Sequence, residues 1–429
     1  MNRPDTQTPR PRSRRREEAV PAPAAGNGWP RVRLGEVCVS KTGTRNPVDA
    51  PDSSFRYVDI TSVDNVSKRI VAPKELFGRD APSRARQVIR TGDVLVSTTR
   101  PNLNAVALVP PELDGEIAST GFCVLRGSEE MDSEFLFSFV RTPEFVSRLT
   151  ELTKGALYPA VNDKQVFAQF ISLPPLAEQR RIAGRLREQM AEVARARAAV
   201  QAQLATAQAL PAAVLRAHFT TPAALRWPRR KVGELVVSPL RTGLSKSAKA
   251  DSPWRCLGLS SVRDGNLIMD AAKPVDVTAH EAEANRIRAG AFYVVRGNGN
   301  LRLVARGALA PQTVTEPILF PDLLIEMNPD TERILPLYLR WVWDSAEVRT
   351  ALEDRARTSA GIHKINLRNL AGVEIPLPPL AEQRALAARL TAELSAATAL
   401  RESLTARLAA IERLPAALLS TAFTPGQSA

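Results

Sequence analysis

Cysteine, histidine and long apolar stretches are all scarce in this chain of 429 residues. The three cysteines, Cys38, Cys123 and Cys256, are far apart and odd in number, which excludes a disulfide framework and a CxxC-type zinc site. No two of the three histidines have the i, i+4 spacing of a zincin. No apolar run reaches the roughly 20 residues that a membrane helix needs, and the first residues lack the apolar core of a secretory signal. We therefore expect a cytoplasmic protein that holds no metal and does not enter a membrane.

Motifs of catalysis are missing as well. The sequence contains no GxxxxGK[ST] loop for ATP, no [ND]-Pro-Pro-aromatic tetrapeptide and no glycine-rich loop that would seat a methyl donor. The nearest nuclease-like string runs from Pro321-Asp322 to Glu326, but no lysine follows it, and a strand end is the better explanation. The few histidines offer no paired base and nucleophile. We therefore predict no catalytic residues and no cofactor.

The charge balance favours a polyanionic partner. Lysine and arginine total 58 against 45 acidic residues, a net charge of +13, and such an excess most often indicates binding to nucleic acid. An arginine-rich proteome would produce the same balance, so charge alone does not decide the function. Residues 1–28 carry five prolines and the run Arg14-Arg15-Arg16, and we predict that they form a disordered basic tail.

An internal repeat organises the rest of the chain. The segment that begins at Trp29 returns at Trp227, 198 positions later. The string Leu-Pro-Pro-Leu-Ala-Glu-Gln-Arg at 173–180 returns unchanged at 377–384, 204 positions later. The chain is therefore a tandem duplication with a net insertion of six residues in the second copy, and the stretches between the matched segments have diverged.

Each copy ends in a predicted long helix. Pro175 and Pro379 suit a helix start, where a missing N–H costs nothing. Pro211 and Pro415 are expected to interrupt the seam after roughly 34 residues, or about 51 Å of helix. Apolar residues recur in alternating steps of four and three, the 3.5-residue period of a coiled coil. A helix that merely lies on its own domain would have the same period. The seam comprises Leu186, Met190, Val193, Arg197, Val200, Leu204 and Ala207 in the first copy and Leu390, Leu394, Ala397, Arg401, Leu404, Leu408 and Ile411 in the second.

The direction of the two helices follows from the domain between them. The first helix should end near His218, and because domain termini commonly lie close together, the second helix should start near that point. Short β-rich runs followed by helical runs predict a small α+β domain at the front of each copy. We thus predict a pseudo-two-fold symmetric α+β protein. Two tandem domains, 29–170 and 223–374, are separated by long helices in 171–222 and 375–429 that form an antiparallel coiled coil.

The polar residues of both domains suit nucleic acid better than catalysis. Arginine pairs bidentately with guanine and asparagine with adenine, and both side chains can also hold phosphates. For each of these positions a plain surface turn or support of the fold is an equal alternative. The candidate DNA contacts are Arg100, Asn102, Asn104, Lys154 and Tyr158 in the first domain and Arg296, Asn298, Asn300, Arg302, His363, Lys364 and Arg368 in the second.

The order of variable domain, Leu-Pro-Pro-Leu-Ala-Glu-Gln-Arg and long helix, repeated once, resembles the specificity subunit of type I restriction–modification enzymes. The run from Asp93 through Ser97 to Leu103 is also similar to members of that family. The resemblance implies two target-recognition domains, each reading half of an interrupted site in double-stranded DNA. It further implies that the helices bind two modification (methyltransferase) subunits, joined by restriction subunits that are ATP-dependent translocases and nucleases. The chain itself would then be non-catalytic, and no base-contacting residue carries over, because these residues vary between members.

Two other classes stay open at this point. A coiled-coil scaffold would bind DNA without regard to sequence or not at all, and a single-chain restriction enzyme would methylate DNA without a partner. If the chain is a specificity subunit, small and apolar residues of the helices that lie off the seam should be exposed and should dock the methyltransferase subunits. These residues are Ala183, Leu380, Ala387 and Ala388.

Overall fold

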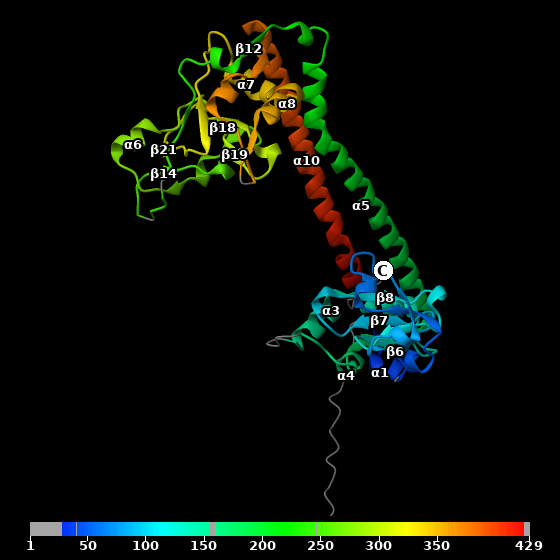
Figure 1. Ribbon diagram of the computed structural model, residues 1–429. Coiled ribbons are helices and arrows are strands. Elements are labelled where there is room, and N and C mark those ends of the chain that lie inside the picture. Colours follow the sequence, from blue (N-terminus) through cyan, green and yellow to red (C-terminus); the bar gives the residue numbers. More distant parts are fainter. Residues whose placement is uncertain are drawn as a thin grey trace, which may run out of the picture. The chain divides into compact units, whose positions relative to one another are not determined.

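The computed structural model describes residues 28–39, 41–153, 159–245, 247–249, 251–359 and 361–423. The chain divides into two compact units (Figure 1): unit 1 comprises Met1–Ala199 and Leu408–Ala429, and unit 2 comprises Val200–Arg407. Each unit thus contains one globular α+β domain and parts of both long helices. The predicted basic tail lies outside the described residues except for Gly28. No helix of the described part is both long and apolar enough to cross a membrane.

The domain of unit 1 is built on two small sheets, of strand order β5-β2-β9-β6 and β10-β7-β8. Its strands are β1 (Arg31–Arg33), β2 (Ser54–Val58), β3 (Val63–Asp64), β4 (Arg69–Ile70), β5 (Lys74–Phe77), β6 (Ala85–Val88), β7 (Val94–Ser97), β8 (Val106–Leu108), β9 (Ile117–Ser119), β10 (Phe122–Leu125) and β11 (Phe170–Ser172). Its short helices are α1 (Leu34–Val37), α2 (Ser133–Phe139), α3 (Pro143–Glu151) and α4 (Asp163–Phe167).

The domain of unit 2 has a six-stranded sheet of order β13-β22-β18-β20-β16-β15 and two three-stranded sheets, β17-β14-β21 and β19-β24-β23. Its strands are β12 (Arg229–Lys231), β13 (Arg241–Thr242), β14 (Arg255–Cys256), β15 (Val262–Arg263), β16 (Asn266–Leu267), β17 (Lys273–Pro274), β18 (Phe292–Val295), β19 (Gly297–Asn298), β20 (Gly307–Leu309), β21 (Ile318–Leu319), β22 (Leu324–Met327), β23 (Arg357–Ser359), β24 (Ile362–Lys364) and β25 (Glu374–Pro376). Its short helices are α6 (Ala279–Ala284), α7 (Pro336–Trp343), α8 (Ala346–Arg355) and α9 (Leu367–Ala371).

Both domains bury the two faces of a central strand. In β7, Val94 lies in the core that the helices cover, whereas Leu95 lies in the core between the two sheets. In β18, Phe292 and Tyr293 divide in the same way between two cores. Because successive side chains of a strand point to opposite faces, a strand buried on both sides reads as a continuous apolar run. This is why both strands stand out in the sequence.

The two ends of each domain are paired with one another. Strand β1 pairs antiparallel with β11 in unit 1, and β12 pairs antiparallel with β25 in unit 2. The two ends of each domain therefore lie side by side, which is the premise from which the antiparallel helices were predicted. The domain of unit 2 is thus an insertion between α5 and α10 that is carried by two adjacent strands.

The two long helices, α5 (Leu176–Phe219) and α10 (Leu380–Phe423), are 44 residues each, about 66 Å at 1.5 Å per residue. They are antiparallel within each unit. In unit 1, Arg197 of α5 lies 3.6 Å from Glu412 of α10, and in unit 2, His218 lies 2.9 Å from Glu393. The start of one helix therefore packs beside the end of the other. The predicted α+β class with antiparallel helices is confirmed.

The expectation that the two prolines limit the helices to about 34 residues was wrong, whereas the expected end of the first helix near His218 is confirmed. Pro211 and Pro415 both lie inside helices that run on to Phe219 and Phe423. Beyond each proline, apolar side chains pack on a domain core: Leu215 and Phe219 are buried in the core of unit 2, and Leu419 is buried in that of unit 1. The Phe423 ring packs against the same core, with its centroid 4.9 Å from that of Phe135. This burial offsets the lost hydrogen bond and the steric strain of a proline within a helix, about 3 kcal/mol.

The seam residues lie on the buried sides of α5 and α10. Leu186, Val200, Leu390, Leu394, Leu404 and Ile411 are buried, and Met190, Val193, Leu204 and Leu408 are partly buried. The Arg197 side chain keeps part of its surface in solvent and reaches Glu412, as expected of an arginine that extends from a seam to its edge.

The expectation that Ala183 and Ala387 are exposed was wrong. Both are about 3% exposed and pack in the cores of their own units, because the first two turns of each long helix lie on the preceding domain. Leu380 is half-buried, and Ala388 alone of the four is exposed. Ala183 and Ala387 are therefore not available to a partner subunit.

The glutamine of each repeated octapeptide fastens its helix to its domain. Gln179 is fully buried; its Oε1 accepts from the Asp132 N–H at 2.9 Å, and its Nε2 donates to the carbonyls of Glu130 and Pro174 at 2.8 and 2.9 Å. Gln383 is also fully buried and makes the equivalent three bonds, to the Leu335 N–H and the carbonyls of Arg333 and Pro378. These bonds join the chain just before α2 or α7 to the start of the long helix. The identical geometry explains why this octapeptide is unchanged while its surroundings diverged.

Removing either glutamine side chain should destabilise one unit selectively. We expect Gln179→Ala to lower the free energy of unfolding of unit 1 by about 2–4 kcal/mol, because it leaves a buried N–H and two carbonyls without partners. Thermal unfolding and hydrogen exchange at the Asp132 amide measure the effect. Gln203→Ala, at an exposed position of α5, is the matched control and should change neither. Equal stability of the two variants would contradict a fastening role.

Candidate nucleic-acid interface

The predicted DNA contacts gather on one turn in each unit. In unit 1 the chain leaves β7, makes the short 3-10 helix η4 (Pro101–Leu103) and enters β8. In unit 2 it leaves β18, passes β19, makes the 3-10 helix η10 (Leu301–Leu303) and enters β20. We call residues 100–104 tip 1 and residues 298–303 tip 2. The two tips occupy equivalent places in the repeat but differ in sequence.

Each tip pairs with the segment that precedes the next long helix. In unit 1, Thr99 forms a β-bridge with Ala160, and the Arg100 N–H donates to the Pro159 carbonyl at 2.8 Å. In unit 2, β19 pairs with β24, which places Asn298 opposite His363 and Gly297 opposite Lys364. In unit 2 the structure thus brings predicted residues that are far apart in the sequence, Asn298 and His363 with Lys364, to adjacent strands. Lys154 and Tyr158 lie outside the described residues.

A cleft of about 440 Å³ opens beside tip 2. Arg296, Asn298 and Lys364 contribute to it, and so do apolar side chains that include Leu323 and Ile362, both 43% exposed. Apolar walls with cations beside them suit the bases and sugars of a nucleic acid together with its phosphates better than a free small anion. Its lining residues are Leu259, Arg296, Gly297, Asn298, Gly299, Asp322, Leu323, Ile362 and Lys364.

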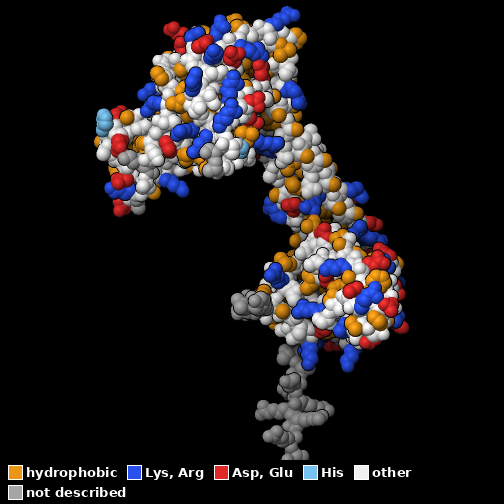
Figure 2. All heavy atoms as spheres, viewed as in Figure 1, with side chains coloured by type: hydrophobic (Ala, Val, Ile, Leu, Met, Phe, Trp, Pro, Cys, Tyr) orange, Lys and Arg blue, Asp and Glu red, His pale blue; other side chains and the backbone are white. Residues whose placement is uncertain are grey.

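Five of the ten predicted side chains that the structure describes are wholly free to donate hydrogen bonds. Within the described part of the chain, the side chains of Arg100, Asn102, Arg302, Lys364 and Arg368 make no hydrogen bond or ion pair, and all five residues are exposed. Basic side chains also gather over the middle of the visible face of unit 2 (Figure 2). The groups offered to a ligand are therefore cationic donors, which match the phosphates and acceptor-rich base edges of DNA.

The asparagines are used partly by the fold itself. The Asn104 amide donates to the Val140 carbonyl at 3.0 Å, and its side-chain oxygen is buried, so Asn104 supports tip 1 rather than facing solvent. Asn298 and Asn300 accept backbone N–H bonds from Asn300 and Arg302 through their side-chain oxygens. Their NH₂ groups stay available. Asn102 is thus the exposed asparagine of tip 1.

Tip 1 is held in an unusual backbone conformation. Arg100 and Asn104, which flank η4, have φ values of 49° and 46°, in the left-handed region that costs a non-glycine residue about 1–3 kcal/mol. The Lys68 ammonium donates to the Asn104 carbonyl and secures the end of the turn. Burial of the Lys68 side chain, and to a smaller extent the nearby Arg141, lowers the Lys68 pKa to about 8. Strain of this kind concentrates at ligand-binding turns.

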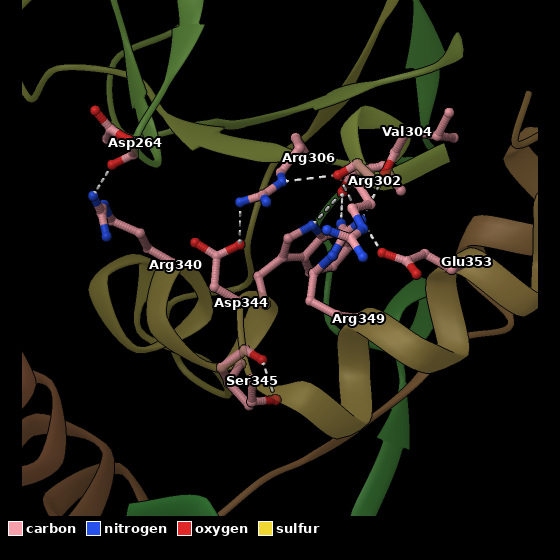
Figure 3. A network of polar contacts seen from close by, with 12 residues as sticks. Asp264, Arg302, Val304, Arg306, Arg340, Asp344, Ser345, Arg349 and Glu353 are labelled. Carbon is pink, nitrogen blue, oxygen red and sulfur yellow. Dashed lines mark hydrogen bonds and ion pairs between the residues drawn. The ribbon is translucent and has the colours of Figure 1, made fainter. Parts of the chain in front are cut away.

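Tip 2 is held by a network centred on Arg349 of α8 (Figure 3). The Arg349 guanidinium donates to the carbonyls of Ala305 and Val304, both at 2.9 Å, and of Arg302 at 3.4 Å, and it pairs with Glu353 at 3.1 Å. Ala305 is itself in the left-handed region, with φ of 54°.

Two further side chains support the same turn. The Trp343 indole donates to the Ala305 carbonyl at 2.8 Å, and the Arg306 Nε donates to the Arg302 carbonyl at 3.1 Å. Neither Lys68 nor Arg349 was among the residues predicted from the sequence. Nothing local marks them, because Arg349 reads as one more basic residue on a helix and its acceptors lie 44 to 47 positions away.

Comparison with known proteins agrees with this geometry. Residues 27–194 match the family described as the type I restriction modification DNA specificity domain. A solved structure of the HsdS subunit from Thermoanaerobacter tengcongensis is 31% identical, covers 94% of this chain and 97% of its own, and superposes with a TM-score of 0.67. The chain belongs to the specificity subunits of type I restriction–modification systems.

Other specificity subunits align over most of this one. A chain from a structure that addresses complex assembly and conformational transition of the type I R-M system is 32% identical, covers 95% of this chain and 99% of its own, and has a TM-score of 0.76. The EcoKI specificity subunit of Escherichia coli (strain K12) is 24% identical over 366 residues, which are 82% of this chain and 77% of that protein. The function predicted from the sequence, DNA recognition as a type I specificity subunit, is confirmed.

Proposed function

We propose that tips 1 and 2 each read one half of an interrupted site in double-stranded DNA. The observation that carries the proposal is the equivalent placement of the two tips with unlike free donors. Tip 1 offers Arg100 and Asn102, whereas tip 2 offers Asn298 and Arg302 with Lys364 beside them. Two diverged readers on a repeated frame suit two different half-sites. The target-recognition domains proposed to carry them span 29–170 and 223–374.

The chain is proposed to be a non-catalytic subunit whose helices bind its partners. Two modification (methyltransferase) subunits would supply methyl transfer, and restriction subunits would supply ATP-dependent translocation and cleavage. With Ala183 and Ala387 buried, the docking surface falls on the exposed sides of the helices. Ala388, Leu400 and Leu414 are exposed there and are apolar side chains that these sides offer to a partner. The spacer regions proposed for this role are 171–222 and 375–429.

Co-expression with the modification subunits of the host, followed by methylome sequencing, tests the proposal. We expect one interrupted site to be methylated, and none when either protein is expressed alone. Two modification subunits for each copy of this chain should appear in native mass spectrometry. Methylation by this chain alone would support a single-chain enzyme, and a fully active one-to-one complex would contradict the proposed stoichiometry.

Single substitutions at tip 2 should separate base reading from phosphate binding. If Arg302 contacts a base edge, we expect Arg302→Ala to weaken DNA binding by about 1–3 kcal/mol and to relax the sequence preference at one base pair. Lys364→Ala should instead weaken binding to all DNA sequences alike. It should also lower the slope of log affinity against log salt concentration by about one, the loss of one phosphate contact. Lys273→Ala, at an exposed lysine of β17 in the same unit, is the matched control. Binding that is equally affected by the two lysine variants would place the interface elsewhere.

A further inference from the structure

Each tip presents an exposed leucine beside a free arginine. Leu103 of tip 1 is 48% exposed and Leu303 of tip 2 is 45% exposed. A single surface leucine needs no explanation. Here, however, the corresponding 3-10 helices of two diverged domains, η4 and η10, both end in an exposed leucine, although the 198-position register of the repeat pairs Leu103 with Leu301. The recurrence indicates that the apolar side chain has a function at this place.

The backbone around each leucine is held rigidly while the side chain is left outside. In tip 1 the Leu103 N–H donates to the Arg100 carbonyl at 2.9 Å, and left-handed residues flank the turn on both sides. In tip 2 the carbonyls before and after Leu303 are both bound by Arg349 (Figure 3). A turn that is already ordered loses little conformational entropy on binding, so its side chain can contribute most of its contact energy.

The surroundings of Leu303 identify the chemistry of its partner. The cleft beside tip 2 exposes Leu323 and Ile362, and its charged lining residues are Arg296, Lys364 and Asp322. Arg302 is exposed on the tip itself, next to Leu303 in the chain. Cations beside an apolar surface match a polyanion whose interior is apolar, which is the character of DNA with phosphates outside and bases within. In DNA, leucine can contact the 5-methyl group of thymine or the face of a base.

We propose that Leu103 and Leu303 are specificity-determining residues that enter a groove of their respective half-sites and make apolar contact with a base. The neighbouring Arg100 and Arg302 bind the adjacent DNA at the same time. Arg349 acts as a positioning residue for tip 2 and does not touch DNA. The inference rests on the proposed reading of half-sites by the two tips.

The test uses the full chain in complex with its modification subunits. Binding is measured on duplexes in which each base pair of the methylated site is replaced in turn. The variants are Leu303→Ala, Leu303→Asn and Leu303→Met, with Leu103→Ala as the reciprocal variant in the other unit. Leu225→Ala, at a leucine of unit 2 that is 58% exposed and lies outside tip 2, is the matched control. Thermal unfolding and native mass spectrometry of every variant report folding and assembly.

Loss of the apolar contact should change the base preference only near the substituted leucine, and an apolar side chain of similar volume should preserve binding. We expect Leu303→Ala and Leu303→Asn to weaken binding about five- to tenfold and to relax one or two adjacent base pairs of one half-site. Leu303→Met, which stays apolar and of similar volume, should bind within about twofold of the wild type. Leu103→Ala should relax the other half-site, and Leu225→Ala should bind as the wild type does.

Several outcomes would overturn the proposal. Leu303→Ala binding within twofold of the wild type with unchanged base preference would show that the leucine does not touch DNA. Loss of modification subunits from the Leu303→Ala complex would show that tip 2 contacts protein instead. A lowered melting temperature would assign Leu303 to the fold. Failure of the underlying proposal is visible separately, because the wild-type complex would then show no preference for an interrupted site.

Discussion

Exchange of residues 227–374 for the corresponding domain of another specificity subunit should replace one half of the methylated site and leave the other half unchanged. The pairing of β12 with β25 brings the two ends of this domain together, so an exchanged domain enters and leaves the chain at one place. Since the two tips carry unlike donors, the new domain should bring its own half-site. Methylome sequencing of the hybrid, co-expressed with the modification subunits, measures the outcome directly.

The junctions of such a hybrid are set by packing. The core of unit 2 includes Leu215 and Phe219 from the end of α5 and Leu390 from the start of α10. The new domain must fit these side chains, because mismatched volumes in a core cost about 1–3 kcal/mol. The reciprocal exchange of 29–170 is the control and should change the other half-site. A hybrid in which both halves change together would show that the domains do not read DNA independently.

Lengthening both long helices should lengthen the unread gap between the half-sites. Four residues add about 6 Å to a helix, and B-DNA rises about 3.4 Å per base pair, so we expect a gap longer by one or two base pairs. Seven residues add about 10.5 Å, or about three base pairs, and keep the 3.5-residue seam in phase. The bases read at each end should stay the same, and methylation at the original spacing should be lost.

The insertions must lie at the same level of the antiparallel pair. The repeat alone makes Ala198 and Glu402 equivalent, but Arg197 faces Glu412, so residue 198 faces about residue 411. By the same register, Leu204 faces about residue 405, and insertions there extend both helices together. Insertion into α5 alone is the control, because it shifts the seam out of register and should abolish methylation. A doubly extended chain that still methylates only the original spacing would show that the helices do not set the distance.

Much of the architecture follows from the sequence because its signals are local or repeated. The unchanged octapeptide predicted the duplication, and the steps of four and three predicted the helices that begin at Leu176 and Leu380. Their antiparallel direction followed from the expectation that the ends of a domain meet, which the pairing of β12 with β25 satisfies. A periodic pattern over dozens of residues is readable without knowledge of any distant contact.

Only the tertiary structure decided that the helices continue through their prolines and which polar residues are free. α5 continues through Pro211 because Phe219 is buried in a core made by residues far along the chain. Asn104 resembles Asn102 in the sequence, yet its amide is committed to the Val140 carbonyl. Arg349 matters because three carbonyls converge on its guanidinium. Each of these outcomes depends on a contact between residues distant in sequence, and no local pattern encodes the partner.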